Sequence, residues 1–276
     1  MPFGAVLALV LAAVAWLAAG PAGAQQWRPS NCIIIADAAP GTRDLHRAAW
    51  TDPVPQRTVR LSYVAHSMFL LQTEGGFNLV TDYNGHLGPT VLRPDAVTMN
   101  RAHSSHWSDN IDGIEHVLRG WSEQFGIAAD HYLDLGEILI RNVTTDIRSW
   151  GTVEEDGNSI FVFETAGLCI AHLGHLHHEP TDAQYAALGR IDVLMVPVDG
   201  GYTMDLPTMI RVVQRLRSSI VVPMHWFGPA NLETFLGGMS SSFAVTRPGV
   251  SEMLLSRETL PSQPTVVVLE PQPLSD

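Results

Sequence analysis

The sequence contains no lysine. All 16 of its basic residues are arginines, they are outnumbered by 28 Asp and Glu residues, and the formal net charge is −12 at pH 7. Binding to nucleic acid or to anionic lipid depends on clustered positive charge, so this composition argues against both as partners. The lack of lysine also excludes Schiff-base catalysis and the lysine-dependent phosphate-binding loop.

Cysteine is almost as scarce, because the chain has only Cys32 and Cys169. Two cysteines are too few for a cysteine-built zinc site. An oxidising compartment would permit a disulfide between them, but the sequence alone does not tell whether they are close. Cys169 lies inside an apolar run, which favours a buried free thiol.

Three common catalytic signatures are also missing. The chain has no Gly-x-Ser-x-Gly elbow, no His-Glu-x-x-His helix and no Gly-x-Gly-x-x-Gly turn. Serine hydrolases, zincin-type metalloproteases and dinucleotide enzymes therefore gain no support.

The first 24 residues differ in composition from the rest. Residues 3–19 are apolar, and Ala22 and Ala24 then supply the small residues of a signal-peptidase site. We expect cleavage before Gln25 and a periplasmic or secreted protein with no membrane contact afterwards. An uncleaved membrane anchor is the alternative, because no Lys or Arg precedes the apolar run.

The remaining chain is long enough for one large α/β domain or two small ones, and 46% of the whole sequence is hydrophobic. Residues 25–57, rich in Pro, Ala and charged residues, are interpreted as an N-terminal extension. Residues 58–276 contain no evident linker and are expected to form one domain.

The first half of this domain shows the pattern of strands and hairpins. Expected strands are residues 59–73 and 77–82 around a Gly75-Gly76 turn, 95–100, and the hairpins 130–143 and 159–172, with turns at Gly136 and at Ala166-Gly167. Residues 114–121 fit either a strand or a short helix.

The second half alternates strands with helices. Thr181 and Gln184 form a capping box for a helix that ends at Gly189, and Asp205 caps a second helix that runs to Arg217. Further expected elements are strands 191–198, 220–224 and 265–270 and a helix from 229 to about 239. Such alternation implies parallel β-α-β units. We therefore predict an α/β fold with two packed mixed sheets flanked by helices.

Histidines gather where apolar strands end. His103 and His106 follow strand 95–100, the string IAHLGHL carries His172 and His175, and His225 ends strand 220–224. The carboxyl ends of strands in an α/β sheet share one edge, where ligands bind. Imidazoles that converge there predict a metal site. His66 is interpreted as a pocket wall, and His177 and His178 as residues of a solvated loop.

Five strings in order carry a family resemblance. They are Val64-Ala65-His66-Ser67, Leu79-Val80-Thr81-Asp82, Ala171-His172-Leu173-Gly174-His175, the run 196–203 and Val222-Pro223-Met224-His225. With the His103 loop they resemble the metallo-β-lactamase fold superfamily of metal-dependent hydrolases, in particular its ascorbate phosphate lactonase-like and N-acylphosphatidylethanolamine phospholipase-like branch. The resemblance covers about residues 58–269 and implies a four-layer αββα sandwich.

The metal motif departs from this family. The family loop reads His-x-His-x-Asp-His, but Arg101 stands at its first histidine and Ser105 at its aspartate. The bridging aspartate of the family's Gly-Asp motif is His175 here, and residues 142–150 offer only Asp146 as a comparable ligand. Neutral imidazole normally binds one metal, whereas a bridging carboxylate joins two.

These departures predict a single ion. The resemblance and the strand ends together suggest as ligands His103, His106, His175 and His225, with His172 either a ligand or a core residue. Three or four imidazoles suit zinc, and iron, copper and nickel are alternatives.

Acidic and basic residues near this edge are assigned supporting roles. The resemblance implies that Asp82 orients the metal loop. Asp199 and Asp109 are candidate general bases, or caps of their loops. Arg101 is expected either to hold a substrate anion or to pair with Asp82 or Asp199.

Two functions fit these features. The first is an exported metal-dependent hydrolase that acts on a small ester, lactone, phosphodiester or amide through a metal-activated water. The second is a catalytically degenerate protein that binds metal or ligand on the same fold, an alternative kept open by Ser105. The oligomeric state stays open.

Overall fold

Apolar residues that alternate along short strands produce a six-stranded sheet at the start of the domain. The computed structural model describes residues 28–33, 49–124, 127–149 and 151–276, and the predicted signal peptide lies outside these ranges. The sheet has the order β13-β1-β2-β3-β4-β5. Its strands are β1 (Val59–Ala65), β2 (Met68–Thr73), β3 (Asn78–Val80), β4 (Ala96–Met99), β5 (His116–Arg119) and β13 (Glu252–Leu255).

The second sheet has eight strands in the order β12-β14-β11-β10-β9-β8-β7-β6. They are β6 (Tyr132–Asp134), β7 (Ile138–Ser149), β8 (Thr152–Thr165), β9 (Leu168–His172), β10 (Val193–Pro197), β11 (Ile220–Met224), β12 (Ala244–Thr246) and β14 (Thr265–Val267). Strands β9, β10, β11, β14 and β12 are parallel, and β6 to β9 are antiparallel hairpins. Each sheet is mixed, as predicted.

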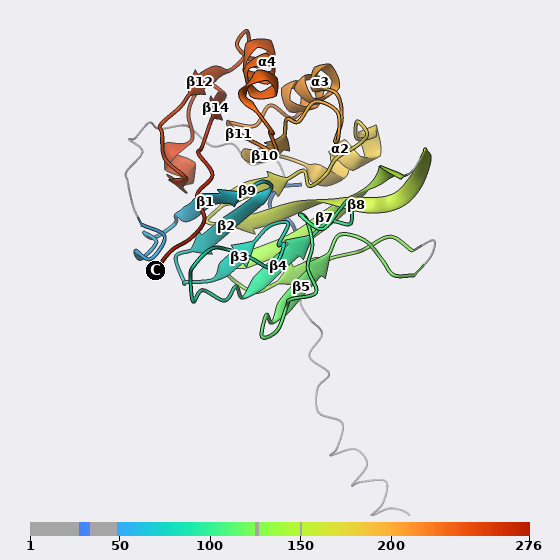
Figure 1. Ribbon diagram of the computed structural model, residues 1–276. Helices are drawn as coiled ribbons and strands as arrows, with labels where there is room; N and C mark the ends of the chain where they lie inside the picture. Colours follow the sequence, from blue (N-terminus) through green and yellow to red (C-terminus); the bar gives the residue numbers. More distant parts are fainter. Residues whose placement is uncertain (1–27, 34–48, 125–126, 150) are drawn as a thin grey trace, which may run out of the picture.

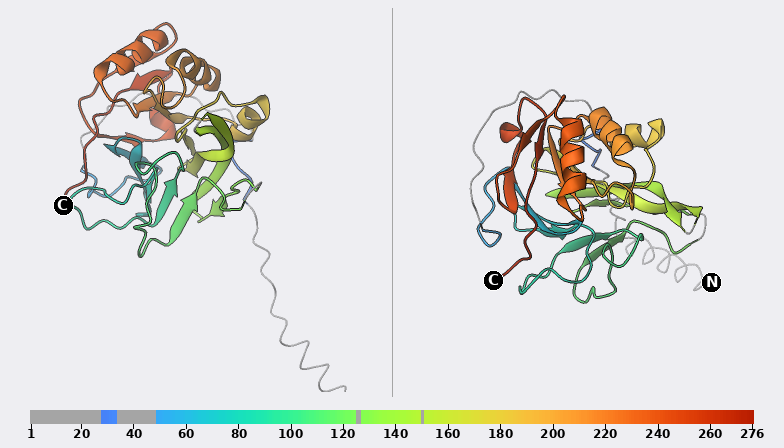
Figure 2. Two further views of the ribbon diagram at one scale, coloured as in Figure 1. Left: turned by 45° about the vertical axis from the view of Figure 1, so that its right-hand side comes forward. Right: turned by 45° about the horizontal axis from the view of Figure 1, so that its top comes forward.

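Three α-helices lie on the outer side of the eight-stranded sheet, away from β1 to β5 (Figures 1 and 2). They are α2 (Asp182–Leu188), α3 (Leu206–Leu216) and α4 (Pro229–Met239), and a short 3-10 helix, η1, spans Arg257–Thr259. The predicted caps are confirmed: Thr181 and Gln184 form a capping box on α2, and Asp205 accepts a hydrogen bond from Thr208 at the start of α3. The expected α/β class is therefore confirmed.

The main core lies between the sheets. Val59, Leu61 and Tyr63 of β1 point into it, as do Val193 and Met195 of β10, and all are nearly or fully buried. The alternate residues of β10 pack against the helices instead. Because β9, β10 and β11 are buried on both faces, their sequences are continuously apolar. In the described residues, loops cover the outer face of the six-stranded sheet with side chains such as Tyr83, Leu87 and Trp121.

One expected strand is divided. The run 59–73 was predicted as one strand, but a turn at His66 and Ser67 separates β1 from β2, and the two strands pair antiparallel. His66 has a φ of 48°, in the left-handed region that bulky residues rarely adopt. The ambiguous run 114–121 contains strand β5. No helix in the described ranges is long and apolar enough to cross a membrane.

Cys32 and Cys169 form a disulfide, which corrects the expected free thiol. Cys169 faces the helix side of β9, and residues 28–33 fold back over that side, so the two buried side chains meet. Glu164 accepts hydrogen bonds from Ser30 and from the backbone N–H of Asn31. The sequence could not show this return of the N-terminal segment.

Removal of the disulfide is expected to destabilise the protein by about 2–5 kcal/mol. The two cysteines are 137 residues apart, so the bridge strongly restricts the unfolded chain. Urea unfolding of the wild type with and without reductant, beside a Cys32→Ala/Cys169→Ala variant, measures this difference.

The double variant is the control, because reductant should leave its unfolding midpoint unchanged. Equal midpoints for oxidised and reduced wild type would contradict a stabilising bridge.

Candidate metal centre

Four histidines from three separate places in the chain converge at one edge of the two sheets. His66 lies in the turn between β1 and β2, His103 and His106 lie in the loop after β4, and His225 directly follows β11. One ring nitrogen of each lies within 4.8 Å of those of the other three. His106 and His225 are buried, whereas His103 is exposed, so the cluster opens to solvent on the side of His103.

Two carboxylates orient the buried pair. Nδ1 of His106 lies 2.6 Å from Asp82 Oδ2, and Nδ1 of His225 lies 2.9 Å from Asp199 Oδ2. A carboxylate partner keeps the imidazole proton on Nδ1 and leaves Nε2 as a bare acceptor. Asn100 donates to Asp82 at 2.9 Å, which favours the charged carboxylate against the pKa-raising effect of burial. The orienting role expected for Asp82 is confirmed.

The two bare nitrogens face each other. Nε2 of His106 is 3.3 Å from Nε2 of His225, so two lone pairs oppose each other in a buried place. Two ligands on a tetrahedral ion with metal–nitrogen bonds of about 2.0–2.1 Å are themselves about 3.3 Å apart. The residues therefore fit a metal ion.

His66 is the member of the cluster that sequence reasoning missed. Its Nε2 is buried and has no hydrogen-bond partner among the described residues, and burial lowers the pKa of its imidazole to about 3. A buried polar atom without a partner is rare in folded proteins. Its backbone carbonyl accepts hydrogen bonds from Tyr63 Oη at 2.6 Å and from His225 N at 3.0 Å, which hold the turn in place.

Burial also lowers the pKa of the imidazoles of His103 and His106. These rings are therefore neutral at pH 7, which is the form that binds metal. His103 is positioned by Ser105, whose Oγ lies 2.7 Å from its Nδ1.

His175, an expected ligand, lies beside the cluster. Its Nε2 is 3.2 Å from Nε2 of His103, and its backbone N–H donates to Asn158 Oδ1 at 2.8 Å. Its ring lies edge-on to those of His106 and His225.

His172 does not join the cluster. Its Nδ1 accepts from Gly174 N at 3.1 Å, and its Nε2 therefore carries the proton that it donates to Ser67 O at 2.8 Å. Neither nitrogen remains for a metal, so the ligand interpretation of His172 is corrected to that of a core residue. It fastens the end of β9 to the turn that carries His66.

The hydrogen bonds of Asp199 fit the loop cap that was the alternative to a general base, and they also position His225. Burial alone would raise the pKa of its carboxyl, but hydrogen bonds from His225, Thr203 and Gly201 hold that pKa well below its ordinary value. Its two oxygens accept four hydrogen bonds, which leaves it ill suited to take a proton. The other candidate base, Asp109, is exposed, pairs with Arg119 at 3.9 Å and is not a member of the cluster.

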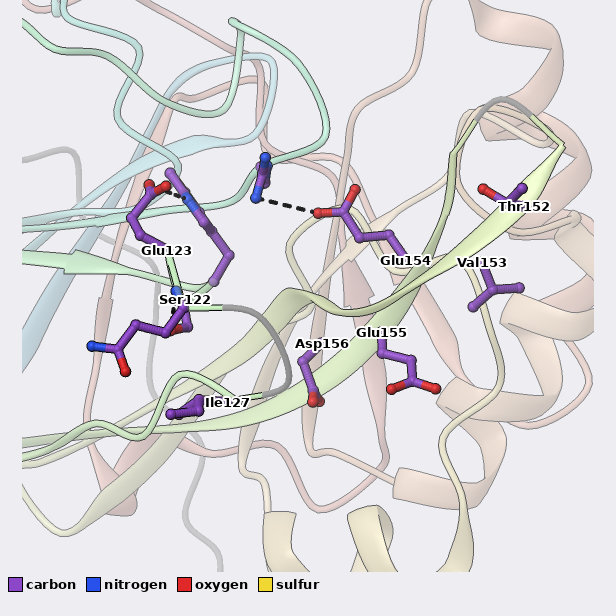
Figure 3. A pocket seen from close by; sticks show the side chains of 11 residues that line it. Ser122, Glu123, Ile127, Thr152, Val153, Glu154, Glu155 and Asp156 are labelled. Atoms are coloured by element: carbon purple, nitrogen blue, oxygen red, sulfur yellow. Dashed lines mark hydrogen bonds and ion pairs between the residues drawn. The ribbon is translucent and has the colours of Figure 1, made fainter.

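Arg101 belongs to the lining of a cavity. Figure 3 shows the side chains of Glu154, Glu155 and Asp156 at this cavity. Nη1 of Arg101 is 3.4 Å from Glu154 Oε1, so its partner is neither Asp82 nor Asp199 as expected. The cavity has a volume of about 700 Å³. Its lining contains the carboxylates of Glu123, Glu154, Glu155 and Asp156 around Trp121 and Ile127.

Asp146, the remaining carboxylate considered as a ligand, also lies elsewhere. Its Oδ1 accepts from the backbone N–H of Asp156 at 3.0 Å, which stabilises the ribbon of β7 and β8.

Known proteins resemble this chain in sequence and fold. A family model described as the beta-lactamase superfamily domain matches residues 60–225. A metal-dependent hydrolase of Methanosarcina barkeri is 21% identical over 191 residues, which cover 61% of this chain and 83% of the relative. Another, from Thermoplasma acidophilum, is 26% identical over 163 residues, or 50% of this chain and 68% of that protein.

Solved structures show the same architecture. A Thermotoga maritima protein assigned to the zinc-dependent hydrolases of the metallo-β-lactamase superfamily aligns with a TM-score of 0.54 and 26% identity. The alignment covers 78% of this chain and all of that one. The metallo hydrolase Igni18 of Ignicoccus hospitalis aligns with a TM-score of 0.52 and 18% identity, over 72% of this chain and 99% of its own.

Loss of any one clustered imidazole is expected to weaken metal binding strongly. His66→Ala, His106→Ala and His225→Ala should each lower zinc affinity by more than about 100-fold, beyond the 10 to 100-fold typical of residues that only support a ligand. Competition with a chromophoric chelator measures each dissociation constant.

Two histidines outside the cluster serve as controls. His86→Ala, at an exposed position, should leave the affinity unchanged, and His177→Ala should change it less than the cluster variants do. A His66→Ala protein that binds zinc as tightly as His86→Ala would remove His66 from the site.

Proposed function

The chain belongs to the metallo-β-lactamase superfamily of metal-dependent hydrolases, and we propose that it hydrolyses a small ester, lactone, phosphodiester or amide outside the cytoplasm. The observation that supports this most directly is the pair of bare imidazole nitrogens 3.3 Å apart. A divalent ion held there would polarise a carbonyl or phosphoryl oxygen and lower the pKa of a coordinated water.

The protein contributes orientation and access. Asp82 and Asp199 fix which nitrogens of His106 and His225 point into the site. His103 lies at the open side of the cluster, where a substrate can approach. Rigid donors of this kind lose little entropy on binding a metal or a substrate, which is how positioning contributes to rate.

One ion is proposed, and zinc is the preferred identity. The two positions that supply carboxylates in the family hold Ser105 and His175, so no carboxylate bridges two metals here. Imidazole ligands suit zinc, and iron, copper and nickel also accept them. The assignment of the Thermotoga maritima protein to zinc-dependent hydrolases agrees with this preference.

Export is proposed on two grounds. The first is the signal-peptide pattern of residues 1–24. The second is the disulfide between Cys32 and Cys169, since disulfides persist in oxidising compartments and are rare in the cytosol.

The purified protein is expected to hold about one transition-metal ion per chain. Four neutral imidazoles from one cluster can satisfy one ion, and the carboxylate that would bridge to a second is missing. Elemental analysis of protein expressed with added zinc, and again with iron, measures both stoichiometry and identity.

The His106→Ala protein is the control, because it should retain less metal than the wild type after the same desalting step. Two tightly held ions per chain would refute the single-ion proposal, and none would refute the metal centre.

The zinc-loaded protein is expected to hydrolyse at least one substrate class of a test panel, and this activity should be lost when a chelator removes the metal. The panel contains lactones, aryl esters, phosphodiesters and β-lactams. Among the described residues that line the cavity, Arg101 is the only basic one, and its exposed ion pair with Glu154 exchanges readily. Arg101→Ala should therefore lower kcat/KM by about two- to fivefold for anionic substrates, the range of an exposed pair.

The kcat/KM for neutral substrates should not change in the Arg101→Ala protein. Arg211→Ala is the matched control, because Arg211 forms a similar exposed pair with Glu179 on a different part of the surface. An equal loss for neutral and anionic substrates would exclude an anion-binding role for Arg101. Bound metal with no turnover of any class would favour a degenerate binding protein instead.

A further inference from the structure

A chain of hydrogen bonds links a backbone amide to the histidine cluster. The N–H of Arg148 on β7 donates to Nδ1 of His177 at 2.6 Å. Nε2 of His177 is 2.6 Å from Nδ1 of His175, and Nε2 of His175 is 3.2 Å from Nε2 of His103. The chain ends at Ser105, whose Oγ lies 2.7 Å from Nδ1 of His103.

The first bond fixes the direction of the others. A backbone N–H can only donate, so Nδ1 of His177 is a bare acceptor and its proton is on Nε2. That proton must point to Nδ1 of His175, which is then also bare. His175 consequently carries its own proton on Nε2, the nitrogen that faces the cluster.

This protonation state has opposite consequences for two neighbouring rings. His103 accepts the hydrogen bond from His175, so its Nε2 is a bare nitrogen that can bind a metal, and its Nδ1–H donates to Ser105. A nitrogen that carries a proton cannot also bind a metal. His175 lies next to the metal ligands but presents an N–H to them.

We propose that His175 is a neutral hydrogen-bond donor to the substrate and not a metal ligand, and that His177 is the positioning residue that holds it in this tautomer. The role of His175 rests on the hydrolase function proposed above. Once the lone pair of His103 is engaged by metal, the Nε2–H of His175 is free to donate to a substrate oxygen on which negative charge develops. Fixed donors of this type stabilise the transition state of acyl or phosphoryl transfer.

Other contacts hold the donor in place. The backbone N–H of His175 donates to Asn158 Oδ1 at 2.8 Å, and Nδ2 of Asn158 donates to Thr145 Oγ1 at 2.9 Å. Gly174, with a φ of +59°, precedes it, and a Cβ at that position would lie 2.4 Å from Asn100 Nδ2. The main chain before His175 therefore has little freedom, as a directional donor requires.

The tautomer can be measured directly. In protein labelled with ¹⁵N-histidine, the imidazole ¹⁵N shifts should show a protonated Nε2 and a bare Nδ1 for His175, without and with zinc. The signals are assigned by their loss in His175→Gln. A zinc-bound Nε2 with the proton on Nδ1 would overturn the proposal.

Two variants of His175 distinguish a hydrogen-bond donor from a metal ligand. His175→Leu should change zinc affinity by less than about tenfold, the lower limit of a supporting residue, while it lowers kcat by about 10²–10³-fold, the effect of losing one such donor. His175→Gln should recover part of this rate, because its amide can donate from a similar position. A loss of zinc affinity as large as that of His106→Ala would show that His175 is a ligand.

His177 has its own control. His177→Ala should let His175 populate both tautomers in the ¹⁵N spectrum. His178→Ala should not, because His178 is the next imidazole in the sequence but takes no part in this chain of hydrogen bonds. An unchanged His175 tautomer in His177→Ala would refute the positioning role. The NMR and affinity measurements do not depend on turnover, so they test His175 even if none of the panel substrates is hydrolysed.

Discussion

The site depends on two buried acceptor nitrogens held 3.3 Å apart by two carboxylates. Without a cation between them, the lone pairs of His106 and His225 repel each other where little water can screen them. Packing of the surrounding strand ends maintains this arrangement. Such stored repulsion is a common feature of functional sites, where the surrounding structure determines an unfavourable local geometry.

The backbone around the site also adopts unfavourable conformations. Three non-glycine residues of the site, His66, Asp82 and His225, have φ angles of 48°, 43° and 58°. His66 and His225 lie directly after a strand and Asp82 lies two residues after β3, at points where the chain must turn sharply to direct a side chain inward. Strand β11 is buried on both faces, so the two cores fix the point at which the turn to His225 begins.

Most of the fold could be predicted because it follows from local signals. The periodicity of apolar residues located the strands, and Thr181, Gln184 and Asp205 marked the starts of two helices. His103, His106 and His225 were predictable members of the site because each follows a strand that ends at the shared edge. Their distances from one another required the structure.

The features that were predicted wrongly share a cause: each of them depends on contacts between distant parts of the chain. The turn at His66 was not predicted because the run 59–73 contains no Gly, Pro or Asn to signal a turn. That turn is held by a hydrogen bond from His225, far along the sequence. The disulfide depends likewise on how residues 28–33 return over β9. Asp199 and His172 lie at the predicted edge, but their hydrogen bonds show that one orients a ligand and the other fastens two strands.

The balance of charge supports the single ion that we propose. Asp82 and Asp199 stand behind His106 and His225 and together carry two negative charges, which one divalent cation neutralises. In the family pattern the aspartates at the positions of Ser105 and His175 would add further negative charge, enough to balance a second cation. Here a neutral hydroxyl and a neutral imidazole replace them, and Arg101 adds a positive charge close by in the sequence. A second ion would therefore be poorly compensated in a partly buried site, where uncompensated charge is costly. In the single-ion site that we propose, His175 stands where the family pattern has a bridging carboxylate and presents an N–H donor there.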